Sequence, residues 1–477
     1  MSSATISDNA VEIEEKPAFR KIEPIGYAFG DIGNGFYFQL VSNYALIYLT
    51  DALGIGAAVA GAIIFIAKLF SAFTDFGFGR VSDKAKLRKD GRYHWFIRVF
   101  RYPLMITMVL FFLPQVAHMP MGLRITWCTL LYMLTVVFYS AIGAGYGSLA
   151  SVSTPVVKHR DAMASGRGFG STAGGIIVGF FLPLLVYKTV NGHKTLQGGI
   201  FVWIALVFVA LMWLCYEFTL RSTVERIQID KSDEESQVPL GKALKAMFTN
   251  RAMVAIVAAA LLLILTQLFA GSVNNYLYKD YFNNTFALSI LAFQNVPALI
   301  IAPFAPAICD RFGKKSACGV TLAVSAVVFL LMYFMHITNP WVFVALSFVA
   351  NLGNGFFGLM VWSFITDITD DIQVKTHTRE DGTVYTGYMF FRKIGQALSG
   401  LFAGAAVTWT GYMSATAGQD IVQPQAVLDR IYDVATIVPA VGYALIAVVL
   451  LAFYPLSGKI AKQNAQILAE RHAQGKL

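Results

Sequence analysis

Long apolar runs alternate with short polar stretches along the whole chain. A helix needs about 20 apolar residues to cross a bilayer, and six such runs lie on each side of a longer polar stretch. The first six lie near 26–50, 56–79, 95–115, 122–150, 165–188 and 197–218. The other six lie near 251–278, 285–309, 317–336, 341–368, 386–412 and 434–455. The pattern predicts an all-α membrane protein with twelve transmembrane helices.

The central polar stretch divides the chain into two halves. We predict an N-terminal six-helix bundle over 25–218 and a C-terminal six-helix bundle over 251–455, joined by a linker over 219–250. Polar tails precede and follow them over 1–24 and 456–477. The halves also repeat in sequence. Asp83 is separated from Asp310 by nearly the same number of residues as Arg167 from Lys393. A duplicated six-helix unit is typical of transporters that bind substrate between two halves, near the middle of the membrane.

The distribution of charge predicts the orientation. Only 14% of the residues are charged, against about 25% in soluble proteins. Lys and Arg gather in the stretches 80–94 and 310–316, whereas 51–55, 116–121 and 337–340 hold none. Positive loops stay on the cytoplasmic side, so we expect cytoplasmic termini and a cytoplasmic linker. The net charge of +9 comes from these short clusters, which predict contact with lipid rather than nucleic acid.

The sequence gives little support to an enzyme, a disulfide-rich protein or a receptor. It contains no His-Glu-x-x-His metal motif, no Gly-x-Ser-x-Gly nucleophile elbow and no phosphate-binding loop. The four cysteines lack paired spacing, so no disulfide framework or zinc site is expected. No soluble signalling region is present, as a receptor would require. We therefore predict a transporter without a cofactor, and a membrane-embedded enzyme is the weaker alternative.

Ionisable residues inside the predicted spans are the first candidates for function, because burying charge in a membrane is costly. They include Asp31, Lys68, Asp75, Arg167 and Lys393. Lys68 and Asp75 are seven residues apart, so they share one face of a helix. A buried Asp beside a Lys changes its charge when a proton or Na⁺ arrives, as a cation symporter needs. Such a pair can also merely fix helix register, and both interpretations stay open.

Amide, hydroxyl and aromatic side chains add candidates for substrate binding. Hydroxyl-rich ligands are usually held by amide and carboxylate groups beside an aromatic face. The same side chains also hydrogen-bond helices to one another. The candidates within the spans are Asn34, Tyr37, Tyr139, Ser140, Asn275 and Trp362.

Several motifs carry a family resemblance over nearly the whole chain. They include GYAFGDIGNGF, AFTDFGFGRVSD, SGRGFGSTAG and YTGYMFFRKIGQA, which begin at residues 26, 72, 165 and 385. The chain resembles the glycoside–pentoside–hexuronide:cation symporters, the group of the major facilitator superfamily that contains melibiose permease. The resemblance implies the major facilitator fold, two pseudo-symmetric bundles, alternating access and a bacterial inner membrane. It also implies a small sugar or glycoside as cargo, and we expect a functional monomer.

The resemblance implies roles for particular residues. Asp75 and Lys393 match the cation site, and Arg167 matches the sugar site. Tyr139 and Ser140 match positions near both. We assign cation coupling to Asp75, Lys393, Tyr139, Ser140 and Ser71. We assign substrate binding to Asp31, Asn34, Tyr37, Arg167, Asn275 and Trp362. The acidic–basic clusters resemble a cytoplasmic latch, so we assign gating to Asp83, Arg92, Asp310 and Arg311. Those clusters also fit a simple topology signal.

Departures from the family pattern change the expected cargo and cation. Ser71 stands where melibiose permease has a second cation-site Asp, which favours H⁺ over Na⁺. Gly35 and Gly143 stand where that protein has sugar-binding Asp residues. These changes remove negative charge while the basic residues stay, and an electropositive cavity suits an anion. We therefore favour an acidic sugar, a hexuronide or a sulfo-sugar. A neutral pentoside or galactoside, or a lysolipid-type amphiphile, is the alternative.

Overall fold

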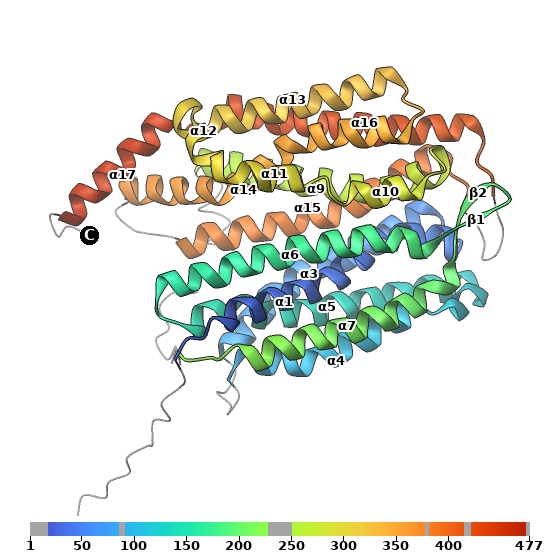
Figure 1. Ribbon diagram of the computed structural model, residues 1–477, viewed down its shortest axis with the longest axis horizontal. Helices are drawn as coiled ribbons and strands as arrows, with labels where there is room; N and C mark the ends of the chain where they lie inside the picture. The colour runs from blue at the N-terminus through green and yellow to red at the C-terminus, as the bar shows by residue number, and fades with distance from the viewer. Residues whose placement is uncertain (1–17, 85–90, 228–249, 377–380, 415–420, 474–477) are drawn as a thin grey trace, which may run out of the picture.

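The computed structural model describes residues 18–84, 91–227, 250–376, 381–414 and 421–473, nearly all of them helical. The helices lie side by side along one long axis (Figure 1). The start of α1 (Ile22–Phe38) and the end of α17 (Gly458–Ala473) lie at the same end of this bundle, which we call the termini end. The strands β1 and β2 lie at the opposite end, which we call the hairpin end.

The N-terminal half contains six helical segments. The first is interrupted by two π-helical turns and comprises α1 (Ile22–Phe38), η1 (Gln39–Asn43), α2 (Ala45–Ile47) and η2 (Tyr48–Ala52). The other elements are α3 (Ala57–Lys84), α4 (Tyr93–Phe111), η3 (Pro114–His118), α5 (Met121–Ser153), α6 (Val157–Val186), β1 (Tyr187–Val190), β2 (His193–Leu196), η4 (Gly198–Ile200) and α7 (Phe201–Ser222). β1 and β2 pair antiparallel, with Tyr187 opposite Leu196.

The C-terminal half contains six more segments, of which the second is broken into α10 (Thr285–Leu291), α11 (Val296–Ile301), η6 (Ala302–Phe304) and α12 (Ala305–Phe312). The other elements are α9 (Arg251–Tyr276), η5 (Leu277–Tyr281), α13 (Lys314–Met335), α14 (Pro340–Thr376), α15 (Asp381–Trp409), α16 (Gln425–Val448), η7 (Val449–Phe453) and α17 (Gly458–Ala473). Twelve helical segments thus precede α17 within the described ranges.

Eight of these segments are, in the part of the chain that the structure describes, long and apolar enough to cross a membrane on their own. The other four have a visible reason to fall short. The first and the eighth are broken into short pieces, and α4 and α15 each carry two Lys or Arg residues. The helices and their hydropathy make this an integral membrane protein, and the segment count agrees with the sequence pattern.

The two halves meet through equivalent helices. The second segment of the N-terminal half, α3, packs on the fifth of the other half, α15. The fifth segment, α6, packs on α10, which opens the second segment of the C-terminal half. This reciprocal pairing is what a pseudo-twofold arrangement of two bundles requires. A Cβ added at Gly61 would lie 2.8 Å from the carbonyl oxygen of Gly400, so α3 and α15 cross with their backbones in close approach.

The predicted spans differ from the helices mainly at their ends. α6 begins at Val157 rather than near 165, and α16 begins at Gln425 rather than near 434. The added turns are polar, and a hydropathy pattern marks only the lipid-facing part of a helix. α17 lies along α14, where the side chain of Asn464 donates a hydrogen bond to Asp371 at 3.1 Å. The domain boundaries stay a prediction, because most of the N-terminal tail and the linker lie outside the described residues.

Glycines on one face of α6 allow it to lie directly on α1. A Cβ at Gly170 would come within 2.0 Å of the carbonyl oxygen of Ala28, and one at Gly174 within 3.0 Å of the Cα of Ile32. A side chain at Gly168 would meet no atom within 4 Å. The packing of α1 on α6 therefore depends on some glycines and not on others.

We expect Gly170→Leu to lower the melting temperature of the detergent-purified protein, because the new side chain must push α1 and α6 apart. Overpacking of this kind costs about 1–3 kcal/mol or more. Gly168→Leu is the matched control, and it should melt like the unmodified protein. Equal melting temperatures for the two variants would show that the α1–α6 contact is not close in the folded protein.

Candidate functional site

Four predicted coupling residues lie together where α3 meets α5 and α15. The Nζ of Lys393 lies 2.7 Å from Oδ2 of Asp75 and 3.2 Å from Oγ of Ser71. The hydroxyl oxygens of Ser71 and Ser140 are 3.2 Å apart. We call Ser71, Asp75, Ser140 and Lys393 the coupling cluster. Its ion pair joins the two halves, since Asp75 belongs to the N-terminal half and Lys393 to the C-terminal half.

The coupling cluster has an unused acceptor, and a buried lysine lies on the same face of α3. Oδ1 of Asp75 is buried and has no hydrogen-bond partner among the described residues. Lys68 is only 7% exposed and forms no ion pair within the described residues. The carboxylate of Asp75 therefore has an oxygen that can take up a cation.

A second group, the Asp31 cluster, comprises Asp31, Asn34, Arg167 and Tyr216. Asn34 donates a 2.9 Å hydrogen bond to Oδ1 of Asp31 and accepts a 2.7 Å bond from the hydroxyl of Tyr216. The Nε of Arg167 lies 3.4 Å from Oδ2 of Asp31, which is long for a charge-assisted hydrogen bond. The Arg167 side chain is 46% exposed, against 12% for Asp31. An anion could therefore reach the guanidinium while Asp31 stays in place.

Two stacked tyrosines join helices that carry the two clusters. The ring centroids of Tyr37 and Tyr139 are 4.0 Å apart, with an angle of 24° between the ring planes. Tyr37 lies on α1 with Asp31, and Tyr139 directly precedes Ser140 on α5. The stacked rings therefore connect the helix of the Asp31 cluster to a helix of the coupling cluster.

Asn275 and Trp362 have their described contacts with other residues. Asn275 is buried at the hairpin end, where it donates to the Asn43 carbonyl at 2.8 Å and accepts from the Tyr187 hydroxyl at 3.2 Å. Trp362 on α14 is 42% exposed and packs edge-on against Tyr388. A substrate-binding role for these two residues stays a prediction.

The predicted gating residues contact neighbours within their own halves. The backbone N–H of Arg92 donates to Oε2 of Glu225 at 2.8 Å. Asp310 is exposed and lies 3.7 Å from Lys462 on α17. The guanidinium of Arg311 lies over the ring of Phe312, and the side chain of Asp83 lies outside the described residues. A gating role for these four stays a prediction.

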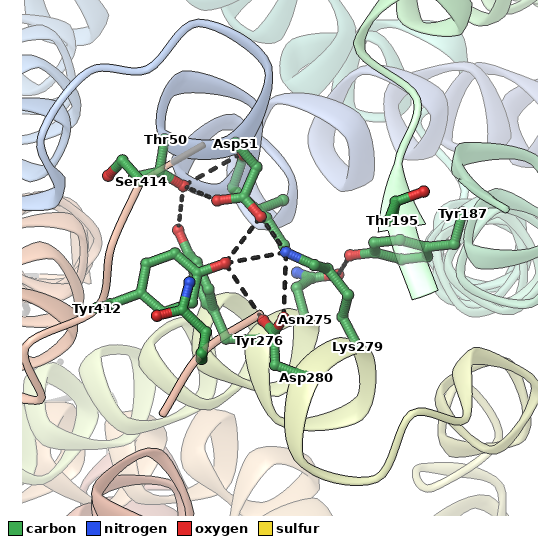
Figure 2. Close-up of polar contacts among 12 residues, drawn as sticks. Thr50, Asp51, Tyr187, Thr195, Asn275, Tyr276, Lys279, Asp280, Tyr412 and Ser414 are labelled. Atoms are coloured by element: carbon green, nitrogen blue, oxygen red, sulfur yellow. Dashed lines mark hydrogen bonds and ion pairs between the residues drawn. The ribbon is translucent and has the colours of Figure 1, made fainter. Parts of the chain in front are cut away.

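Figure 2 shows a buried ionic network that closes the hairpin end and that sequence reasoning missed. Lys279 bonds to Asp51 and lies 3.4 Å from Oδ1 of Asp280. The hydroxyl of Tyr412 lies 2.8 Å from Oδ2 of Asp51 and 2.9 Å from the Lys279 Nζ. Asp51 and Lys279 are only 6% and 8% exposed. We call Asp51, Lys279, Asp280 and Tyr412 the hairpin-end latch.

The hairpin-end latch joins the two halves, because Asp51 ends the first segment and Lys279 ends the seventh. A second contact beside it, 2.8 Å between the hydroxyl oxygens of Thr50 and Tyr276, crosses the same boundary. The sequence held one signal for it. Lys279 follows directly on a predicted span, and burial against two carboxylates accounts for a charge at that position.

Comparison with known proteins agrees with this geometry. The family model described as MFS/sugar transport protein matches residues 26–458. The chain belongs to this family. It is 28% identical to the glucuronide carrier protein homolog of Escherichia coli K12, over 92% of this chain and 93% of that protein. It is also 28% identical to the putative sulfoquinovose importer of the same organism, over 92% and 91%.

Solved structures show the same fold. The nucleoside transporter NupG superposes with a TM-score of 0.62 at 15% identity, covering 92% of this chain and all of that one. The predicted major facilitator fold and the resemblance to sugar symporters are both confirmed. The protein is a membrane transporter of the MFS sugar transport family and not an enzyme.

Lys279→Gln should destabilise the MFS protein more than Asp51→Asn, because it leaves two buried carboxylates without a cation, whereas Asp51→Asn leaves Lys279 beside Asp280. Removing one partner of a buried ion pair costs about 3–5 kcal/mol. Thermal unfolding of the purified protein measures the effect. Asp310→Asn, which alters an exposed pair, is the control and should change nothing. Equal stability of all three variants would contradict a buried, closed latch.

Proposed function

We propose that this protein is a cation-coupled symporter that carries an acidic sugar or glycoside by alternating access, as a monomer. The observation that carries the proposal is the ion pair between Asp75 and Lys393, which joins the two halves on the face of α3 that also holds the buried Lys68. We place the protein in a bacterial inner membrane with both termini in the cytoplasm. Its cargo is a small molecule, and the coupling ion is H⁺ rather than Na⁺.

The coupling ion would bind at Asp75. Oδ2 of this carboxylate holds Lys393, and Oδ1 is buried without a partner. Protonation of Asp75 would remove the negative charge that holds Lys393 and so weaken a bond between the halves. Ser71 supplies a hydroxyl where a second carboxylate would favour Na⁺, which supports H⁺. Coupling between cation and sugar is typically worth about 1–3 kcal/mol.

Charge explains why the cation would favour an acidic cargo. Protonation of Asp75 raises the net charge of the coupling cluster by one and leaves the ammonium of Lys393 without its carboxylate partner. A carboxylate or sulfonate near this ammonium would then bind more tightly, because opposite charges attract strongly in a water-poor cavity. Two relatives are named for acidic sugars, glucuronide and sulfoquinovose, which supports this class of cargo.

Alternating access requires a site that is closed on one side at a time. The hairpin-end latch is buried, whereas the side chains of Arg167 and Asp75 are 46% and 33% exposed. This difference supports a state in which the two clusters are accessible from the termini end and closed off from the hairpin end. Opening the hairpin end would break the Asp51–Lys279 pair and the contacts around it.

The proposal is tested by uptake into proteoliposomes that contain the purified protein. Methyl β-D-glucuronide, sulfoquinovose and methyl β-D-xyloside serve as acidic and neutral probes. We expect an inward proton gradient to drive accumulation of the acidic probes. Uptake that does not change with pH, Na⁺ or membrane potential would reject symport. Accumulation of the neutral xyloside alone would reject an acidic sugar as the cargo.

Asp75→Asn should abolish accumulation of methyl β-D-glucuronide against its gradient while sparing exchange of labelled for unlabelled sugar. The amide cannot take up a proton, but the sugar can still bind and cross. Gln425→Ala, at an exposed position at the start of α16, should behave like the unmodified protein in both assays. Proton-driven accumulation by Asp75→Asn would show that the coupling proton binds elsewhere.

Lys68→Gln should raise the half-saturation concentration for uptake of methyl β-D-glucuronide by about tenfold or more. The half-saturation concentration for methyl β-D-xyloside should change by less than about threefold. Loss of a charge-assisted contact worth about 1.5–3 kcal/mol predicts a change of this size. The ratio of the two half-saturation constants is the measurement. A ratio unchanged by Lys68→Gln would mean that this lysine does not select acidic cargo.

A further inference from the structure

A cavity whose lining shares no residue with either charged cluster lies where the first segment meets helices of the C-terminal half. Its volume is about 190 Å³, and its walls come from α9, α13, α14, α16 and the turn between α10 and α11, with the first segment closing one side. A polar cavity of this size can hold several water molecules or a small polar ligand.

The walls are rich in carboxamides and contain no charged side chain. An Asn or Gln offers two N–H donors and a carbonyl acceptor, which together match the hydroxyl groups of a sugar. Phe343 and Tyr443 add aromatic surface of the kind that packs against the C–H face of a sugar ring. The six carboxamides of the C-terminal half are Gln267, Asn274, Gln294, Asn295, Asn351 and Asn354.

Four of these carboxamides form a chain that fixes their orientation. Gln267 donates to Asn354 at 2.6 Å, and Asn354 donates to Asn351 at 3.3 Å. Asn351 donates in turn to Gln294 at 2.9 Å. Each member uses only part of its hydrogen-bonding capacity in this chain. Such a chain presents donors and acceptors in set positions before any ligand arrives.

The other two carboxamides are not tied into this chain. Asn274 and Asn295 make no side-chain hydrogen bond to any residue within the described ranges. Asn295 is exposed and Asn274 is partly exposed. Both line the cavity, so their donors and acceptors are available to a ligand there.

The break in the eighth segment positions part of the wall. Pro297 follows the break and lacks a backbone N–H, so it cannot continue the usual helical bonding. The backbone of Gln294 instead bonds three residues back to Leu291 at 3.0 Å, and Val296 bonds to Phe293 at 2.9 Å. In transporters, broken helices occur where the backbone lines a cavity or a substrate site.

The first segment connects the cavity to the boundary between the halves. Gln39 and Asn43 line the cavity from the π-helical turn η1. Gln39 also donates to the carbonyl of Gly175 on α6 at 3.3 Å, on the helix that carries Arg167. A ligand in the cavity would therefore touch residues of both halves.

We propose that this carboxamide cavity is a second substrate subsite, which binds an uncharged, hydroxyl-bearing part of the cargo through hydrogen bonds. The inference rests on the proposed function and extends it. The charged clusters select the acidic group, and the cavity recognises hydroxyls whatever the charge of the cargo.

The test compares sugar uptake by Asn274→Ala and Asn295→Ala with uptake by the unmodified protein. Neither substitution removes a hydrogen bond within the protein, so folding should be unaffected and melting temperatures should match. We expect each variant to raise the half-saturation concentration about 3- to 10-fold, as a lost hydrogen bond predicts. The increase should be similar for methyl β-D-glucuronide and methyl β-D-xyloside, and the pH dependence of uptake should stay the same.

Gln425→Ala is the control, because this carboxamide is exposed at the start of α16 and bonds only to Asp429. Unchanged half-saturation constants in both Asn variants, with normal uptake by the unmodified protein, would overturn the cavity proposal alone. A lower maximal rate with an unchanged half-saturation constant would also overturn it, in favour of a structural role. Failure of the unmodified protein to take up either sugar would reject the proposed function and this inference together.

Discussion

The ion pair between Asp75 and Lys393 is the interaction on which the rest of this transporter depends. Charges inside a membrane protein are costly, so a carboxylate and an ammonium in the middle of two bundles need one another. The two groups come from different halves, and their 2.7 Å contact therefore links an electrostatic state to the relative position of the halves. An ion pair within one bundle would stabilise that bundle but would not link the protonation of Asp75 to the relative position of the two halves.

Two other features make this pair useful. Glycines allow α3 to pack closely on α15, as the 2.8 Å approach to Gly400 at Gly61 shows. At the hairpin end, Asp51 and Lys279 form a second ion pair between the same halves. The boundary therefore has one buried ion pair at its end and one partly exposed pair nearer its middle.

The fold could be predicted from the sequence because each membrane-spanning helix needs its own long apolar run, which can be recognised without knowledge of tertiary contacts. Asp75, Ser71 and Lys393 could be placed in one site because their helices and spacing matched a known family. Tyr216 and Lys279 could not be found this way, because their roles depend on contacts with residues far away in the chain. Asn275 and Trp362 were assigned to the substrate site on residue type alone, which does not show the direction in which a side chain on a helix points.

The central claim is that a proton crosses the membrane with the sugar, and proton movement can be measured directly. Proteoliposomes in a weakly buffered medium with a pH indicator outside would receive methyl β-D-glucuronide under an inward sugar gradient. The account predicts that the medium becomes more alkaline as the sugar enters, because each sugar carries a proton inward. Entry of the sugar with no change in external pH, whether or not Na⁺ is present, would contradict it.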